Sequence, residues 1–384
     1  ETIWGFDVKI FYVLSEIMGY ALSKFIGVKV LPGMKAKQRP FYIIGLLGFS
    51  EIALLGFAVF PVPLKIASIF FSGLPLGMIW GIIFSYIEGR RVSEVLNVGL
   101  SVALIISSGL VKTLGQVVLD HFLVSEYWMP FVTGCLCFPF MLFCVWMLDQ
   151  IPAPSKLDVA ARTERVPMNK SERKEFLSRF FWGIVTLIIF YASLTIFREL
   201  RDSFAADLWN ELGVKRAFVF TQTEIPIAFL VLICMFLLVF VRDNRLAINI
   251  IYVVAVVGSI IMITTTWLYL QGWISPLWWM ILSGLGMYLG YIPFTYLIER
   301  LIASLKVVST AIFVIYLADS FGYLGTTGVF LAKNLLSFQI SWSSMLSFTA
   351  IVVGVVSLFR VIVIYRYFRI QLNSLDVVKD FSND

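Results

Sequence analysis

Seven ionisable side chains within long apolar stretches are the residues of this chain that could do chemistry. They are Glu16, Glu51, Lys112, Arg198, Arg201, Glu224 and Asp319. Each stretch is roughly 20 residues long, which is enough for a helix to cross the hydrocarbon core of a bilayer. A charge at the centre of such a helix costs about 2.5–3.5 kcal/mol or more, so each of these groups should face a partner or a polar cavity.

Arg198, Arg201 and Asp202 form the densest group of these charges. Their spacing of i, i+3 and i+4 places them on one helix face, near the end of an apolar stretch. A guanidinium with forked donors suits a phosphate or a carboxylate, so Arg198 is a candidate substrate-binding residue. The alternative is that Asp202 neutralises Arg198 within the helix. For Arg201, closer to the membrane surface, the structural role is the stronger reading.

The other charges suggest coupling or gating. Lys112 and Glu224 lie at similar depth, which allows an ion pair that is either broken during a working cycle or permanent. A membrane carboxylate holds its proton readily, so Glu16 and Asp319 could couple to protons or make structural hydrogen bonds. We expect substrate contacts from Arg198, Lys112, Tyr291 and Tyr323. Coupling or gating roles are expected for Glu16, Glu51, Arg201, Asp202, Glu224 and Asp319.

Composition predicts an integral membrane protein. Apolar residues make up 60% of the 384 and charged residues 14%, whereas soluble domains have about 45–50% and 25%. The net charge of +6 comes from basic residues scattered among short loops, so nucleic acid is not an expected partner. With His121 as the one histidine and four cysteines in apolar stretches, we expect no metal and no cofactor. Walker and Gly-x-Ser-x-Gly motifs are absent from the sequence, which argues against an enzyme.

Eleven apolar segments are predicted to be membrane-spanning helices. They cover residues 8–28, 41–60, 64–87, 95–119, 127–148, 180–205, 217–241, 247–269, 276–298, 308–332 and 342–365. A polar linker at 149–179 divides them. If this linker is cytoplasmic, 20 of the 30 basic residues lie on the cytoplasmic side and five on the other, which sets the orientation. We expect a bacterial cytoplasmic membrane, with the linker and the C-terminus inside.

An internal repeat relates the two sides of the linker. Ser72-Gly73-Leu74 and Ser283-Gly284-Leu285 each precede a glutamate by 16 residues from the serine, at an offset of 211. Ser15-Glu16-Ile17 and Thr223-Glu224-Ile225 repeat at an offset of 208. Such offsets predict two parallel halves with the same orientation. The second half has six segments and the first has five, so we expect a twelve-helix protein whose first helix is missing here.

The predicted fold is therefore all-α, with two parallel six-helix halves and 11 spans visible. Residues 1–148 form the N-terminal half, with helices 2–6 of 12, and 149–179 form the linker. Residues 180–370 form the C-terminal half, with helices 7–12, and 371–384 form a cytoplasmic tail.

This organisation resembles the major facilitator superfamily. The stretch from Gly19 to Lys29 is similar to the superfamily's loop signature after its second helix, with Ser23 where an aspartate is usual. Ser23-Lys24-Phe25 with Gly27 resembles the organophosphate:phosphate antiporter branch, in which a phosphate-contacting arginine of the seventh helix would correspond to Arg198. The resemblance also implies that the helices of Lys112 and Glu224 adjoin, as do those of Glu16 and Asp319.

Together these features predict a secondary active transporter that works by alternating access. The expected partners are the lipid bilayer and a small, phosphorylated or carboxylated anionic solute, with a proton or a counter-substrate as the coupling species left open. We expect a monomer. The alternative is a non-transporting membrane subunit or receptor that has retained the fold, because fold alone does not decide function.

Overall fold

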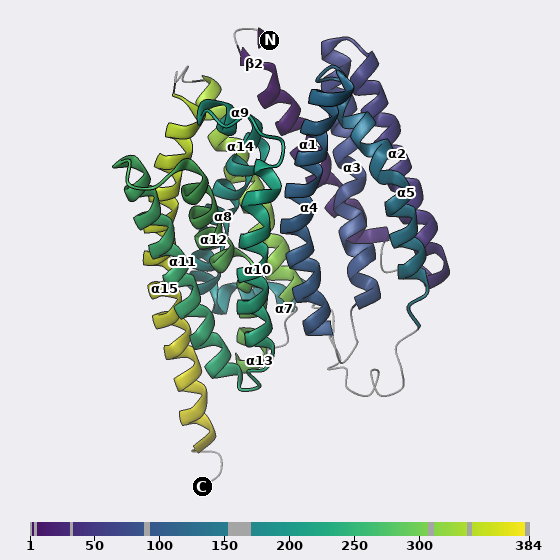
Figure 1. Ribbon diagram of the computed structural model, residues 1–384. Coiled ribbons are helices and arrows are strands. Elements are labelled where there is room, and N and C mark those ends of the chain that lie inside the picture. Colours follow the sequence, from purple (N-terminus) through teal and green to yellow (C-terminus); the bar gives the residue numbers. More distant parts are fainter. Residues whose placement is uncertain are drawn as a thin grey trace. The chain divides into compact units, whose positions relative to one another are not determined.

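The computed structural model describes residues 2–3, 6–30, 34–87, 93–152, 170–305, 311–335 and 340–380. Within these residues the protein is almost entirely helical, and it separates into two compact units (Figure 1). The first unit contains residues 1–97, 110–162 and 330–338, and the second contains 98–109, 163–329 and 339–384. The long helix α4 (Ser93–Phe122) contributes its middle to the second unit and its two ends to the first.

The first unit is a helical bundle arranged around α3. Two short antiparallel strands precede α1. Helices α1 and α2 both pack on α3, and α5 packs on α2. Ile43, Ile82, Tyr86 and Val145 form a buried cluster there. The elements are β1 (Thr2–Ile3), β2 (Phe6–Asp7), α1 (Val8–Val30), the 3₁₀ turn Ala36–Gln38, α2 (Arg39–Val59), α3 (Val62–Ile87) and α5 (Met129–Asp149).

The second unit is a larger bundle in which α12 contacts α8, α10 and α11, and α15 packs on α8 and α11. In Figure 1, α15 is the long yellow helix that runs along the whole unit. The elements are α7 (Lys170–Arg179), α8 (Phe181–Ser203), α9 (Ala205–Glu211), α10 (Val219–Val239), α11 (Asn244–Leu270), α12 (Pro276–Tyr291), α13 (Pro293–Leu305), α14 (Ala311–Leu335) and α15 (Trp342–Asp380).

Local sequence signals explain several helix boundaries. Helices α2, α5 and α12 carry proline in their first turn, where the missing N–H costs no hydrogen bond. Asp243 caps α11 by accepting a 2.7 Å hydrogen bond from the Leu246 amide, and Gly272, with φ of 73°, follows the end of that helix.

The eleven predicted segments are helical over most of their described residues, but three details differ. The segment 276–298 is two helices, because Pro293 has no N–H to continue the hydrogen-bond ladder and the helix breaks at Ile292. The linker is not wholly irregular, since it contains α7. Helix α15 continues well past residue 365. The division into halves at residues 148 and 180 stays a prediction, because the two units do not follow those limits.

The outside of the helices confirms a multi-pass membrane protein. Among the described residues, nine helical segments are long and apolar enough to span a membrane, with α12 and α13 counted as one. Large apolar side chains lie on the outside of these helices. Ile52, Phe140 and Phe348, for example, are 69–71% exposed. In water such a surface would associate or aggregate, whereas lipid chains cover it without cost.

Glycines permit the closest helix contacts. In the first unit, a Cβ on Gly73 would lie 2.5 Å from the carbonyl oxygen of Glu16, so α1 and α3 touch through their backbones. In the second unit, a Cβ on Gly286 of α12 would lie 2.5 Å from the carbonyl oxygen of Gly258 on α11. Membrane helices associate through such small-residue faces.

We predict that Gly286→Ala lowers the thermal stability of the purified protein. The added methyl group must push α11 and α12 apart, and overpacking of this kind costs about 1–3 kcal/mol. Gly328→Ala is the matched control, because nothing lies within 4 Å of a Cβ at Gly328. Equal unfolding temperatures for the two variants would contradict the proposed backbone contact.

Candidate functional site

Helix α8 presents Tyr191 and Arg198 on one face. They are seven residues apart, two helical turns, and both point toward α12 and α14, where their partners lie. Tyr191 is 4% exposed and the Arg198 side chain is 12% exposed, so Arg198 is slightly more accessible than Tyr191.

Tyr191 links α12 and α14 through its hydroxyl group. The hydroxyl donates to Asp319 Oδ1 on α14 at 2.7 Å and shares a hydrogen bond of 2.9 Å with the hydroxyl of Tyr291 on α12. Since Tyr191 has one proton and directs it to the carboxylate, the Tyr291 hydroxyl supplies the proton of the second bond. The two rings are also stacked, with centroids 4.9 Å apart and planes 19° apart.

Arg198 contacts Tyr291 and also reaches Tyr323 of α14. Its guanidinium carbon lies 4.8 Å from the centroid of the Tyr291 ring, a cation–π distance. Its Nη2 donates to the Tyr323 hydroxyl at 3.3 Å and contacts the Glu199 carboxylate. Its Nε is buried and has no hydrogen-bond partner within the described part of the chain. The guanidinium therefore has donor capacity that the described residues leave unused.

We call Tyr191, Arg198, Tyr291, Asp319 and Tyr323 the tyrosine–arginine cluster. Two of its members lie near the middle of their helices, since Tyr191 is the eleventh of the 23 residues of α8 and Asp319 is the ninth of the 25 of α14, whereas Arg198 is the eighteenth residue of α8. Tyr291 is the last residue of α12, directly before the break at Ile292. Interrupted helices at mid-membrane depth are where secondary transporters bind their solutes.

A second polar contact, between Arg201 and Glu224, joins α8 to α10. Arg201 Nη1 lies 2.7 Å from Glu224 Oε1, with side-chain exposures of 3% and 7%, and Nη2 donates to the Met280 carbonyl at 3.3 Å. The guanidinium packs against Gly284 of α12, where a Cβ would lie 3.0 Å from its carbon. The glycine of the second Ser-Gly-Leu motif therefore leaves room for the ion pair.

These contacts include partners that the sequence did not indicate. The Asp202 carboxylate accepts a 2.9 Å hydrogen bond from Ser108, and Arg198 contacts Glu199 and the tyrosines, so neutralisation of Arg198 by Asp202 stays a prediction. Glu224 forms an ion pair with Arg201, a partner that the sequence did not suggest. Arg201 is 3% exposed.

The remaining predicted residues belong to the first unit. Glu16 is on an exposed position of α1, and Lys112 is partly buried on α4. Glu51 of α2 lies against Gly134 of α5 and accepts a 3.4 Å hydrogen bond from the thiol of Cys135. The structure brings Arg198, Tyr291, Tyr323 and Asp319 together in the second unit.

Sequence reasoning missed Tyr191 and Glu199 as members of the site. The signal for Tyr191 was its i, i+7 spacing to Arg198, which places both on one helix face. The signal for Glu199 was an acidic residue next to the arginine, although its direction depends on the helix packing. No linear pattern could have indicated that Asp319, 128 residues away, accepts the proton of Tyr191.

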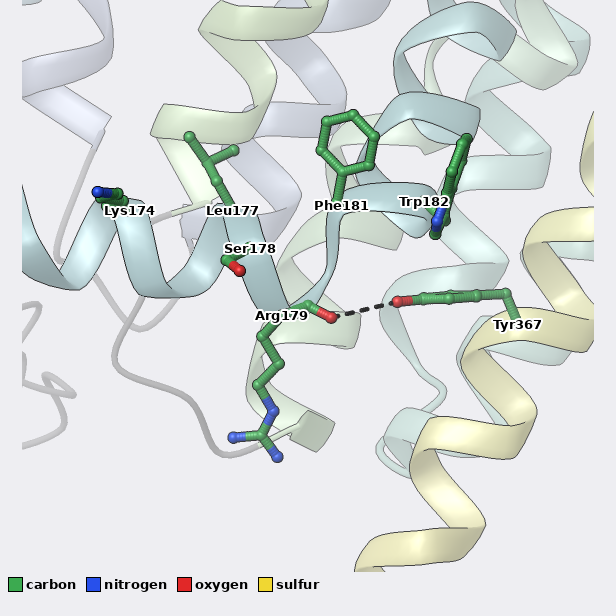
Figure 2. A pocket seen from close by; sticks show the side chains of 7 residues that line it. All are labelled: Lys174, Leu177, Ser178, Arg179, Phe181, Trp182 and Tyr367. Atoms are coloured by element: carbon green, nitrogen blue, oxygen red, sulfur yellow. Dashed lines mark hydrogen bonds between the residues drawn. The ribbon is translucent and has the colours of Figure 1, made fainter.

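Two pockets of the second unit lie away from the cluster. One, of about 510 Å³, is lined by Lys174 of α7, Arg179, Trp182 of α8 and Tyr367 of α15, among others. In Figure 2 the Arg179 side chain extends away from Lys174, and the Tyr367 hydroxyl donates to the Arg179 backbone carbonyl at 3.5 Å. Because its two basic groups diverge, this pocket offers little to a single anion. The other pocket lies between α11 and α15 and is treated below.

We predict that breaking the Arg201–Glu224 pair on one side is more harmful than replacing it. Arg201→Met or Glu224→Leu alone leaves an uncompensated buried charge and should cost about 3–5 kcal/mol of unfolding free energy. The double variant should recover most of that loss. Denaturant or thermal unfolding of all four proteins measures the coupling, and additive losses in the double variant would contradict a direct ion pair.

Comparisons with known proteins give the family and the fold of the chain. The sequence matches the family described as "Family of unknown function (DUF5690)" over residues 1–371. No curated protein matches the chain. Among solved structures, the chain is similar to the crystal structure of a point mutant of the nucleoside transporter NupG, with a TM-score of 0.58 and 14% sequence identity. The match covers 94% of this chain and 91% of that one, so the fold is of the major facilitator type. The chain belongs to the DUF5690 family.

Proposed function

We propose that this protein is a secondary transporter of a small solute that works by alternating access. The observation that carries the proposal is the tyrosine–arginine cluster, a polar group assembled from three helices at mid-span and next to a helix break. In a lipid-embedded helix such groups are costly unless they serve a solute or ion pathway. The likeness to a nucleoside transporter supports the same class of function.

The charge balance of the cluster favours a solute without net negative charge. Arg198 carries one positive charge, whereas Glu199 contacts it and Asp319 lies on the far side of Tyr191. An anionic solute would add negative charge to a cluster in which two carboxylates already outnumber one guanidinium. An uncharged polar solute or a zwitterion could instead accept from Arg198 and donate to Asp319. A nucleoside, the cargo named for NupG, is one such solute.

An anionic solute is the second candidate. It rests on the unused Nε of Arg198, on Lys112 and on the resemblance of Ser23-Lys24-Phe25 to the organophosphate:phosphate antiporter branch. A phosphate or carboxylate could displace Glu199 from the guanidinium, because a bidentate contact is stronger than a single one. We rank it second because Lys112 belongs to the first unit, whereas Glu199 is already at the arginine.

Coupling is assigned to the carboxylates. Asp319, bonded to Tyr191, can exchange its partner for a proton when solute binding moves Tyr191 or Tyr291, which would link solute and proton binding. Arg201, Asp202 and Glu224 would act as gating residues, and Glu16 and Glu51 as further coupling sites. The proposal includes a monomer in a bacterial cytoplasmic membrane, with the linker and C-terminus inside.

We predict that a screen of ligands will find stabilisation by an uncharged or zwitterionic solute. Thermal unfolding of the purified chain is followed with nucleosides, sugars, amino acids, carboxylates and phosphate esters. A ligand at 100 times its Kd adds about 2.7 kcal/mol, enough for a measurable shift. The shift should disappear in Arg198→Gln and Tyr191→Phe, and it should persist in Arg216→Gln, whose arginine lies on an exposed loop.

The other outcomes of the screen are informative. Stabilisation by anions alone, lost in Arg198→Gln, would establish the second candidate. If no solute stabilises the folded protein and none enters proteoliposomes that contain it, the transport proposal is wrong, and a non-transporting subunit or receptor is the better account.

We predict that Asp319→Asn uncouples transport from protons. In proteoliposomes, an imposed pH gradient should drive accumulation of the identified solute by the unaltered protein. Asparagine still accepts from Tyr191 but cannot take up a proton, so accumulation should fall about tenfold or more, equivalent to about 1.4 kcal/mol, while solute exchange without a gradient continues. Accumulation that is unchanged in this variant would remove Asp319 from the coupling mechanism.

A further inference from the structure

The pocket between α11 and α15 has a volume of about 250 Å³. Its polar lining comes from Arg245, Asn249 and Tyr252 of α11 and from Tyr365, Arg369 and Asn373 of α15. Arg245 is the second residue of α11, and Arg369 is five residues before the end of the span Trp342–Ser374. The pocket therefore lies where both helices leave the membrane, and not at the depth of the tyrosine–arginine cluster.

The described residues that line this pocket make it positively charged. They include two arginines and no acidic residue. The N-terminus of α11 adds the positive end of a helix dipole. Asp243, the acidic residue just before α11, uses its carboxylate to cap Leu246. Arg369 donates one hydrogen bond, of 2.9 Å, to the Tyr365 hydroxyl, and a guanidinium has five N–H groups in all. The pocket thus suits an anion with several oxygen atoms.

Tyr252 provides a second and independent indication of a ligand. Its side chain lines the pocket and is 5% exposed, and its hydroxyl has no hydrogen-bond partner among the described residues. A buried hydroxyl without a partner is destabilising, and such groups in native proteins usually have a water or a ligand beside them. Tyr252 and Tyr365 meet edge to face at 5.5 Å, which holds the phenol in place.

The surface beside the pocket is apolar and faces lipid. Val253 and Val257 of α11 are exposed, as are Phe359 and Ile362 of α15, and all four lie further along the two helices toward the membrane interior. A molecule with an anionic oxygen-rich head and hydrocarbon chains would match both parts. The pocket is smaller than the 300–1,000 Å³ or so of sites that enclose drug-sized ligands, as expected if it holds the head alone.

We propose that this pocket binds the phosphodiester headgroup of an anionic phospholipid such as phosphatidylglycerol. Arg245 and Arg369 bind the phosphate, and Tyr252, Asn249 and Asn373 bind the headgroup hydroxyls. The acyl chains lie along the apolar faces of α11 and α15. This site is separate from the proposed solute site, and the inference holds whether or not the protein transports.

The test measures thermal unfolding of the full chain in detergent with added lipid. Phosphatidylglycerol should raise the unfolding temperature by several degrees, whereas phosphatidylcholine, which has no net charge, should not. The double variant Arg245→Gln/Arg369→Gln should lose most of the shift, and Tyr252→Phe should lose part of it. Arg366→Gln is the matched control, since Arg366 is an exposed arginine of α15 outside the pocket lining.

Several results would overturn the proposal. One is an equal shift with both lipids, and another is a shift that is retained in the double variant. A shift produced by inorganic phosphate alone, at a concentration equal to that of the lipid, would show that the pocket takes a free anion. The unfolding temperatures of the variants without lipid establish that each is folded, and native mass spectrometry of the unaltered protein should retain one or more phosphatidylglycerol molecules that the double variant loses.

Discussion

The hydrocarbon core of the membrane contains no water, so every polar group placed there must find its partner within the protein. The buried Arg201–Glu224 ion pair is one such partnership in this chain. Both side chains are nearly inaccessible, Met280 contributes a carbonyl to the guanidinium, and Gly284 removes the side chain that would otherwise occupy its place. Helices α8, α10 and α12 together enclose the pair.

The internal repeat places a glycine at a helix contact in both units. Gly73 and Gly284 hold equivalent places in the repeated Ser-Gly-Leu motif, and each lies against another helix of its own unit. Gly73 meets the backbone of α1 at Glu16, whereas Gly284 meets the Arg201 guanidinium and the Ile227 side chain of α10. The two copies thus use one small residue differently, for direct backbone contact in the first unit and for a buried charge in the second.

Arg198 differs from Arg201 in a way that matters for function. Arg201 is fully enclosed and matched by a carboxylate, which is the arrangement of a structural ion pair. Arg198 is one turn earlier, more accessible and stacked on Tyr291. We therefore propose a structural role for Arg201 and a solute-binding role for Arg198.

The sequence by itself determined the class of protein and the approximate positions of its helical segments, and it named four of the five residues of the tyrosine–arginine cluster as candidates. Apolar length and the spacing of charges are local properties, and a bilayer converts them directly into spans and buried polar groups. Only the tertiary structure decided which charges pair. Arg201 finds Glu224 and Tyr191 finds Asp319 through helix packing, since residues 23 and 128 positions apart leave no periodic trace in the chain. Likewise, the hydrogen bond of Asp202 with Ser108 of α4, 94 positions away, depends on helix packing and could not be read from the sequence.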